Sequence, residues 1–170
     1  MLNLEPQKFV TWDEPIEMLY ACHSRVKQFC RQLLILPDYI AQNGINQAVK
    51  NDVQQILNYF NQAAPLHHDD EEKDFFPTLA QKLPETQQAI HELESQHEAL
   101  HQNWYELREK LQDLLADKLE NIEPELIKRF VSGYDLHISI EEPLFELGRV
   151  HLAESELETM GKIMAERRKI

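Results

Sequence analysis

Apolar residues recur every three or four positions along four long stretches of the chain, which is the spacing of one face of an α-helix. The first stretch reaches about Ile40, and the Asn43-Gly44 pair after it is a typical helix end. Thr11 and Glu14 have the spacing of a capping box, and Pro15 suits a first helical turn. These signals predict a helix from about residue 14 to residue 40.

The second stretch is interrupted by proline but keeps its helical pattern. It begins near Asn46, and Pro65 falls inside it. Because residues 67–74 still read as helical, we expect a kink at Pro65 rather than an end. Phe76-Pro77 is expected to close this helix.

Prolines and charged residues also mark the remaining helices. Pro84 suits the first turn of a third helix, and Pro124 opens a fourth, which Pro143 is expected to break. Ser155 and Glu158 have capping-box spacing and predict a terminal helix, which ends in the basic residues 167–169.

Four long helices with short connections predict an all-α fold, an antiparallel up-down four-helix bundle with an extra C-terminal helix. No linker divides the sequence. We therefore expect residues 1–170 to form a single domain, with a core bundle at about 14–150 and a C-terminal helical extension at about 151–170.

Composition excludes several classes of partner. The chain of 170 residues is 42% apolar with only four glycines, and its formal net charge is −13. Nucleic acids and anionic membranes favour clustered Lys and Arg, so neither is an expected partner. No stretch approaches the roughly 20 apolar residues of a membrane span, and the first residues lack the pattern of a signal peptide. A cytoplasmic protein is predicted, with Cys22 and Cys30 as free thiols.

Histidine and glutamate occur at a spacing that suits metal binding. Three pairs lie four residues apart, so both members of each pair share a helix face, and one further histidine lies on the first helix. All are on or beside apolar stripes, where unpartnered imidazoles and carboxylates would be unfavourable unless a cation bound them. The candidate metal ligands are His23, His67, Glu71, His97, His101, His137 and Glu141.

Each pair taken alone has a plainer interpretation, because a His-x-x-x-Glu pair on a helix is usually a solvated surface pair. The coincidence of three pairs and a lone histidine on predicted core faces favours metal. His68 with Glu72 is an alternative to His67 with Glu71. His91 and His151 fall off the stripes and are predicted to lie on the surface. A group of aromatic residues is expected either to line a pocket beside the metal or to pack in the core: Phe60, Trp104 and Tyr134.

A short internal repeat in the sequence indicates two metal ions. Residues 67–76 and 137–145 share His-x-x-x-Glu-Glu followed by an apolar-aromatic pair, two helices apart. Two metals with roughly six ligands each need about twelve donor positions. Five histidines, two bridging carboxylates and one shared oxide or hydroxide fill all but about one. A site with an open position is suited to a small ligand rather than to a closed structural role.

These residues resemble those of bacterial hemerythrin-like proteins with a His-His-Glu (HHE) cation-binding domain, over roughly residues 14–150. The match consists of His23, the 67–77 segment, His97 with His101, and the 137–142 segment. The resemblance implies two non-haem iron ions with bridging carboxylates, which zinc or manganese could replace. His101 is less regular in the family. Invertebrate oxygen carriers end with an aspartate at a wider spacing than Glu141, so the site is carried over but oxygen transport is not.

The resemblance leads to a function hypothesis with alternatives. We expect a non-enzymatic metal-ion-binding protein that binds or senses dioxygen, nitric oxide or a related small ligand, or iron itself. The alternative is a di-iron enzyme of the nitrosative or oxidative stress response, acting in iron–sulfur cluster repair or in peroxide or nitric oxide reduction. A helical interaction protein with fortuitous histidines is the plainest hypothesis. A homodimer is compatible with all three.

Overall fold

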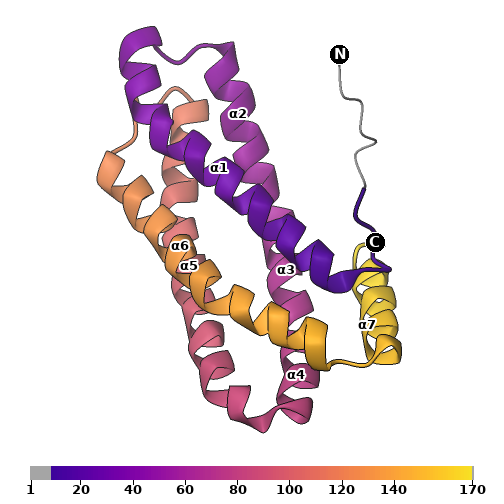
Figure 1. The fold of residues 1–170 in the computed structure, drawn as a ribbon. Helices are drawn as coiled ribbons and strands as arrows, with labels where there is room; N and C mark the ends of the chain where they lie inside the picture. Colours follow the sequence, from indigo (N-terminus) through magenta and orange to yellow (C-terminus); the bar gives the residue numbers. More distant parts are fainter. Residues whose placement is uncertain (1–8, 170) are drawn as a thin grey trace, which may run out of the picture.

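The computed structural model describes residues 9–169, and all regular structure in this part of the chain is helical. Figure 1 shows an antiparallel bundle with a further helix, α7, packed against one end. The predicted all-α bundle with an extra C-terminal helix is confirmed. Residues 1–8 and 170, which belong to the predicted domain and include most of the segment judged for a signal peptide, lie outside the described residues.

Four helical columns form the bundle, and the second consists of three α-helical segments. α1 packs beside α2 and α6, and α5 packs beside the same two. The α-helices are α1 (Pro15–Asn43), α2 (Gln47–Asn58), α3 (Ala64–Asp70), α4 (Phe76–Lys82), α5 (Gln87–Leu115), α6 (Pro124–His151) and α7 (Glu154–Arg167).

The second column continues through two π-helical segments, Tyr59–Ala63 and Glu71–Phe75. The column passes through Pro65 as predicted, but the expected end at Phe76-Pro77 is wrong because the helix runs on to Lys82. Each proline lies in the first turn of the α-helical segment after a π-helical one. The wider π turn changes the hydrogen-bonding register there, so the missing proline N–H is tolerated.

The predicted break at Pro143 is also wrong. α6 continues to His151, and the residues on both sides of the proline are buried, including Glu141, Leu144 and Phe145. Burial of these side chains holds the helix together against a local cost of about 3 kcal/mol for an interior proline. Pro37 lies inside α1 in the same way.

The two predicted capping boxes are not formed. α1 begins at Pro15 with Glu14 as its N-cap, and the Glu14 N–H donates to the Thr11 carbonyl in a preceding turn. α7 begins at Glu154, where the N–H of Ala153 donates to the Glu156 carboxylate at 2.8 Å. The predicted start at Pro84 is confirmed, because a 3₁₀ turn over Pro84–Thr86 leads directly into α5.

The core consists of two apolar clusters along the bundle axis, separated by a polar layer. On α1, Leu19 belongs to one cluster and Val26 to the other. On α5, Leu93 and Leu100 are divided in the same way. His23 and His97 fall between the two clusters, so the fold places these candidate ligands at mid-height and surrounds them with hydrocarbon.

No helix among residues 9–169 is long and apolar enough to cross a membrane. The two cysteines and the two histidines outside the apolar stripes lie as predicted. Cys22 and Cys30 are free thiols, as predicted, and Cys30 is buried. His91 and His151 are exposed, which confirms their placement on the surface.

Candidate metal centre

Every column of the bundle contributes to a buried cluster of six predicted ligands. α1 carries one, the second column carries two at the junction of α3 with its π-helical segment, α5 carries one and α6 carries two. Each is at most 2% exposed: His23, His67, Glu71, His97, His137 and Glu141. The helical repeat explains this convergence, because residues three and four apart share the inward face.

The six residues form two overlapping groups of four. One contains His23 and His67, the other contains His97 and His137, and both contain Glu71 and Glu141. Within each group the candidate ligand atoms all lie within 4.8 Å of one another. Each group thus offers two imidazoles and two carboxylates, a set of donors that could hold a metal ion.

Imidazole nitrogens and carboxylate oxygens face each other across the cluster. The Oε2 atom of Glu141 lies 3.2 Å from Nε2 of His23 and 2.9 Å from Nε2 of His137. The Oε1 atom of Glu71 lies 3.4 Å from Nε2 of His67 and 3.5 Å from Nε2 of His97. Each glutamate therefore contacts one histidine of each group.

Some of these buried donor atoms lack hydrogen bonds. Among residues 9–169, seven buried side-chain nitrogen or oxygen atoms have no hydrogen-bond partner, and six belong to His67, Glu71 and Glu141. Buried polar atoms without partners are costly, and a native protein leaves few of them. A cation within the cluster would use these lone pairs, so the residues fit a metal.

Three of the histidines are oriented by hydrogen bonds at Nδ1, while their Nε2 atoms face the carboxylates. His97 Nδ1 donates to Glu72 at 2.7 Å, and His137 Nδ1 lies 2.9 Å from the side-chain oxygen of Gln96. His23 Nδ1 lies 3.3 Å from a carboxylate oxygen of Glu142. An acceptor at Nδ1 fixes the tautomer and leaves the Nε2 lone pair free for a metal.

The doubled glutamates of the internal repeat thus have distinct positions. In each His-x-x-x-Glu-Glu segment the first glutamate belongs to both ligand groups, whereas the second supports a histidine on a neighbouring helix. The sequence prediction did not include Glu72, Glu142 or Gln96 as supporting residues. The doubling was a signal for two of them, and no sequence signal distinguished Gln96.

Burial also sets the protonation of the cluster. It lowers the pKa of both His97 and His137 to about 3, with further lowering from neighbouring histidines. Burial likewise places the pKa of His67 well below its usual range and raises that of Glu141. The three imidazoles are therefore neutral near pH 7, which is the form that ligates metals.

The structure does not bring His101 to either group. His101 is exposed on α5, and its Nε2 lies 2.9 Å from Nδ1 of His68. His68 is buried and stacks on His97, with 3.9 Å between ring centroids. Between the two alternatives for the second column, His67 with Glu71 belongs to the cluster, whereas His68 and Glu72 belong to neither group.

The predicted aromatic group lies in one of the two apolar clusters. Phe60, Trp104 and Tyr134 are buried there together, and the Phe60 and Trp104 rings are 5.0 Å apart. Trp104 donates its indole N–H to Asn61 at 3.0 Å. Core packing describes their contacts, and His68 lies between Tyr134 and the ligand cluster.

Comparison with known proteins agrees with this geometry. The sequence model described as the hemerythrin HHE cation binding domain matches residues 14–147, which include all six clustered residues. An uncharacterized protein of Haemophilus influenzae is 60% identical over 170 residues, which cover all of this chain and 99% of that protein.

Proposed function

The chain belongs to the hemerythrin HHE cation-binding domain family, and from this premise we propose that it holds two iron ions and binds a small ligand at them. The observation that carries the proposal is the pair of buried four-residue groups that share Glu71 and Glu141. Dioxygen and nitric oxide are the proposed ligands, because both bind to iron with open coordination positions. Sensing or binding such a ligand in the cytoplasm, rather than catalysis, is the proposed role.

Donor counting supports a centre that is open to ligands. Four histidines supply four positions and two bridging carboxylates supply up to four more, of roughly twelve for two six-coordinate metals. A shared oxide or hydroxide takes two further positions. About two then remain, compared with about one if His101 were also a ligand. The proposed set without His101 therefore has one more open position than the set that includes it.

The donor types support iron and leave room for substitutes. Mixed imidazole and carboxylate donors suit iron, zinc and manganese rather than calcium or magnesium. Apolar clusters on both sides of the ligand layer limit the entry of water. A redox-active ion in such a layer can bind a diatomic ligand, whereas zinc has no redox chemistry to support this.

Optical spectroscopy of anaerobically purified protein tests the proposal. The iron-loaded protein is expected to show a visible or near-ultraviolet charge-transfer band that changes on addition of dioxygen or nitric oxide. A Glu141→Ala variant should lose the band, and a Glu98→Ala variant, altered at an exposed position on α5, should keep it. An iron-loaded protein whose spectrum is unaffected by either gas would contradict small-ligand binding.

A further inference from the structure

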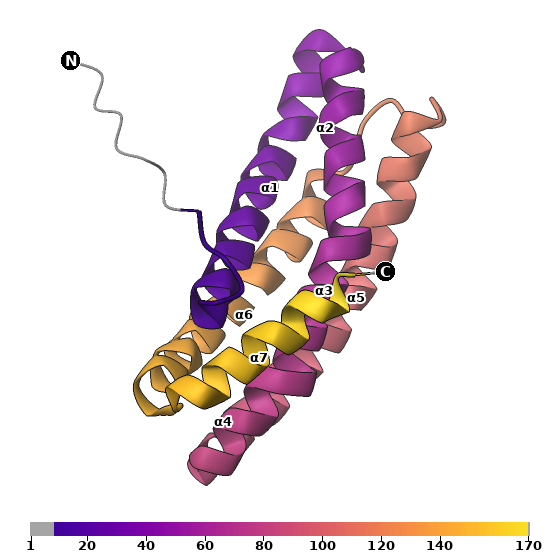
Figure 2. The same ribbon diagram turned by 90° about the vertical axis from the view of Figure 1, so that its right-hand side faces the viewer.

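We propose that the C-terminal helix α7 sets the metal affinity of the centre by holding the polypeptide around Asp70, next to Glu71, which belongs to both ligand groups. This inference rests on the proposed metal centre. α7 lies beyond the residues that match the family, which end at 147. Figure 2 shows α7 crossing the second column at α3 and α4.

Asp70 connects α7 with the candidate metal centre. It is fully buried and directly precedes the candidate ligand Glu71. Its Oδ1 accepts hydrogen bonds from Arg167 at 2.5 Å and from Arg168 at 3.0 Å, and its Oδ2 accepts one from Arg168 at 2.6 Å. Two guanidinium groups thus compensate the charge of a buried carboxylate one residue from the cluster.

Arg167 also spans the π-helical segment that begins with Glu71. One guanidinium nitrogen contacts Asp70 and the other contacts Asp74 at 2.5 Å. The same side chain therefore ties together positions before and near the end of Glu71–Phe75. A single π turn inside an α-helix is rare and is frequently found at functional sites. The bridge fixes the turn from which Glu71 enters the cluster.

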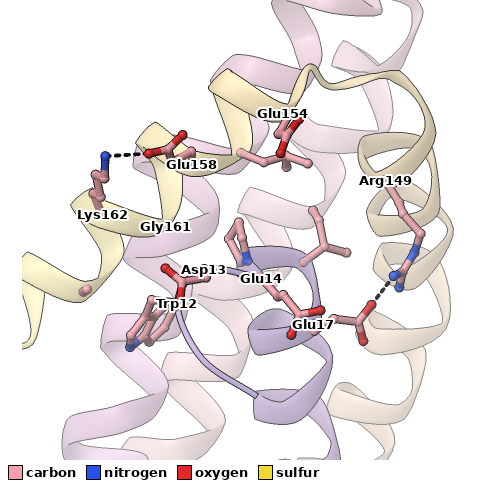
Figure 3. Close-up of a pocket in the computed structure, with 13 residues that line it drawn as sticks. Trp12, Asp13, Glu14, Glu17, Arg149, Glu154, Glu158, Gly161 and Lys162 are labelled. Atoms are coloured by element: carbon pink, nitrogen blue, oxygen red, sulfur yellow. Dashed lines mark hydrogen bonds and ion pairs between the residues drawn. The ribbon is translucent and has the colours of Figure 1, made fainter. Parts of the chain in front are cut away.

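α7 is itself held firmly against the start of the bundle. A Cβ at Gly161 would lie 2.0 Å from the carbonyl oxygen of Trp12, so only glycine allows this approach. The Arg168 guanidinium lies over the Trp12 ring, 4.1 Å from its centroid. Figure 3 shows Gly161 of α7 beside Trp12 in the hollow between α7 and the first turn of α1. The side chains of Arg167 and Arg168 therefore extend from a helix whose position is fixed by its packing.

α7 acts on both ligand groups through the segment that it holds. α7 packs on α1, which carries His23, and on the π-helical segment that begins with Glu71. Glu71 belongs to both groups, and Glu72 of the same segment accepts a hydrogen bond from His97 of the second group. Loss of the arginines should thus weaken the binding of both metal ions.

Cobalt(II) titration of the full chain, followed by its visible absorption, tests this inference. The wild-type protein is expected to bind two ions. In an Arg167→Ala/Arg168→Ala variant, both affinities should fall at least tenfold. Asp74→Asn, which removes only one end of the Arg167 bridge, should weaken both ions more mildly. Lys substitutions at both arginines should restore part of the loss, because charge returns without the planar fork.

The matched control removes two positive charges from the same part of the chain. Lys162 of α7 and Lys169, just after its end, are exposed and pair with Glu158 and Glu166. The Lys162→Ala/Lys169→Ala variant should therefore titrate like wild type. No weakening of either ion in the folded arginine variant with two alanines, or weakening of the same size in the lysine control, would overturn the inference. A wild-type protein that binds no cobalt would instead contradict the proposed function.

Discussion

At the scale of single residues, Glu72 and Glu142 each orient a histidine of a different ligand group. Each accepts from the Nδ1 of one histidine, Glu142 from His23 and Glu72 from His97. Residues that orient a ligating histidine commonly change metal affinity by about 10- to 100-fold. The two glutamates should therefore affect different metal ions.

Alanine substitutions check this division. Glu142→Ala is expected to weaken the ion held by His23 and His67, and Glu72→Ala the ion held by His97 and His137, each by about tenfold or more. Calorimetric metal titration resolves the two steps, with Glu98→Ala as the exposed control. Unchanged affinities in both variants would show that these hydrogen bonds do not position the histidines.

His101 and His97 lie one helical turn apart but differ in burial. His97 is 1% exposed and belongs to a ligand group, whereas His101 is exposed and contacts His68. We expect His101→Ala to keep both metal ions and His97→Ala to lose at least one, as measured by elemental analysis. Loss of one metal ion in His101→Ala would contradict this expectation and support His101 as a ligand, as the sequence predicted.

Cys30 provides a pH dependence outside the centre. Burial raises the pKa of its thiol to about 12, with a smaller contribution from Asp135. The folded pKa lies above the unfolded one, so the stabilisation is complete below about pH 8.5 and is lost as the pH rises towards 12. The free energy of unfolding should fall by about 1.4 kcal/mol per pH unit from this group in that window. Denaturant melts at pH 8 and pH 10 should show a smaller fall in Cys30→Ala, and an equal fall would contradict the assignment.

Sequence spacing predicted six of the clustered residues because helical periodicity alone places residues four apart on one face. Spacing alone could not separate His101 from the clustered residues, since a position one turn from a ligand remains close to the same apolar stripe. Whether that side chain points inward depends on how α5 rotates against its neighbours. Gln96 was not predictable either, because its contact with His137 joins residues 41 positions apart.

At the scale of elements, the helices could be predicted from the sequence, but the effect of their prolines could not. Apolar periodicity gave all four columns, but the expected ends at Pro143 and at Phe76-Pro77 were wrong. A proline penalty is local, whereas the burial that opposes it comes from other helices. The π-helical segments also lack a periodicity signal, because a single wide turn barely changes the pattern of apolar residues.

Pro143 offers a test of this competition. It is exposed and lies inside α6, where it cannot donate to the carbonyl of Ser139 one turn earlier. Pro143→Ala should restore that donor and raise the free energy of unfolding by about 1–3 kcal/mol. Thermal and urea unfolding measure the change. Lower stability of this variant would indicate that the packing of α6 depends on the proline.

At the scale of the whole molecule, the bundle surrounds a polar layer that apolar packing alone cannot stabilise. Six unpartnered atoms of His67, Glu71 and Glu141 lie between the two apolar clusters. Metal that binds only the folded state adds stability, by about 2.7 kcal/mol at a free concentration 100 times the dissociation constant. Metal bound at the proposed centre would thus link the folding of the four columns to the metal supply.

The metal content of the anaerobically purified, iron-supplemented protein tests the central claim most directly. Elemental analysis of the wild-type chain is expected to give close to two metal ions per chain, mainly iron. A Glu71→Ala/Glu141→Ala variant, which removes both shared carboxylates, should fall well below one, while Glu98→Ala should match wild type. Less than about a tenth of a metal ion per wild-type chain after iron supplementation, with the protein folded, would contradict the account.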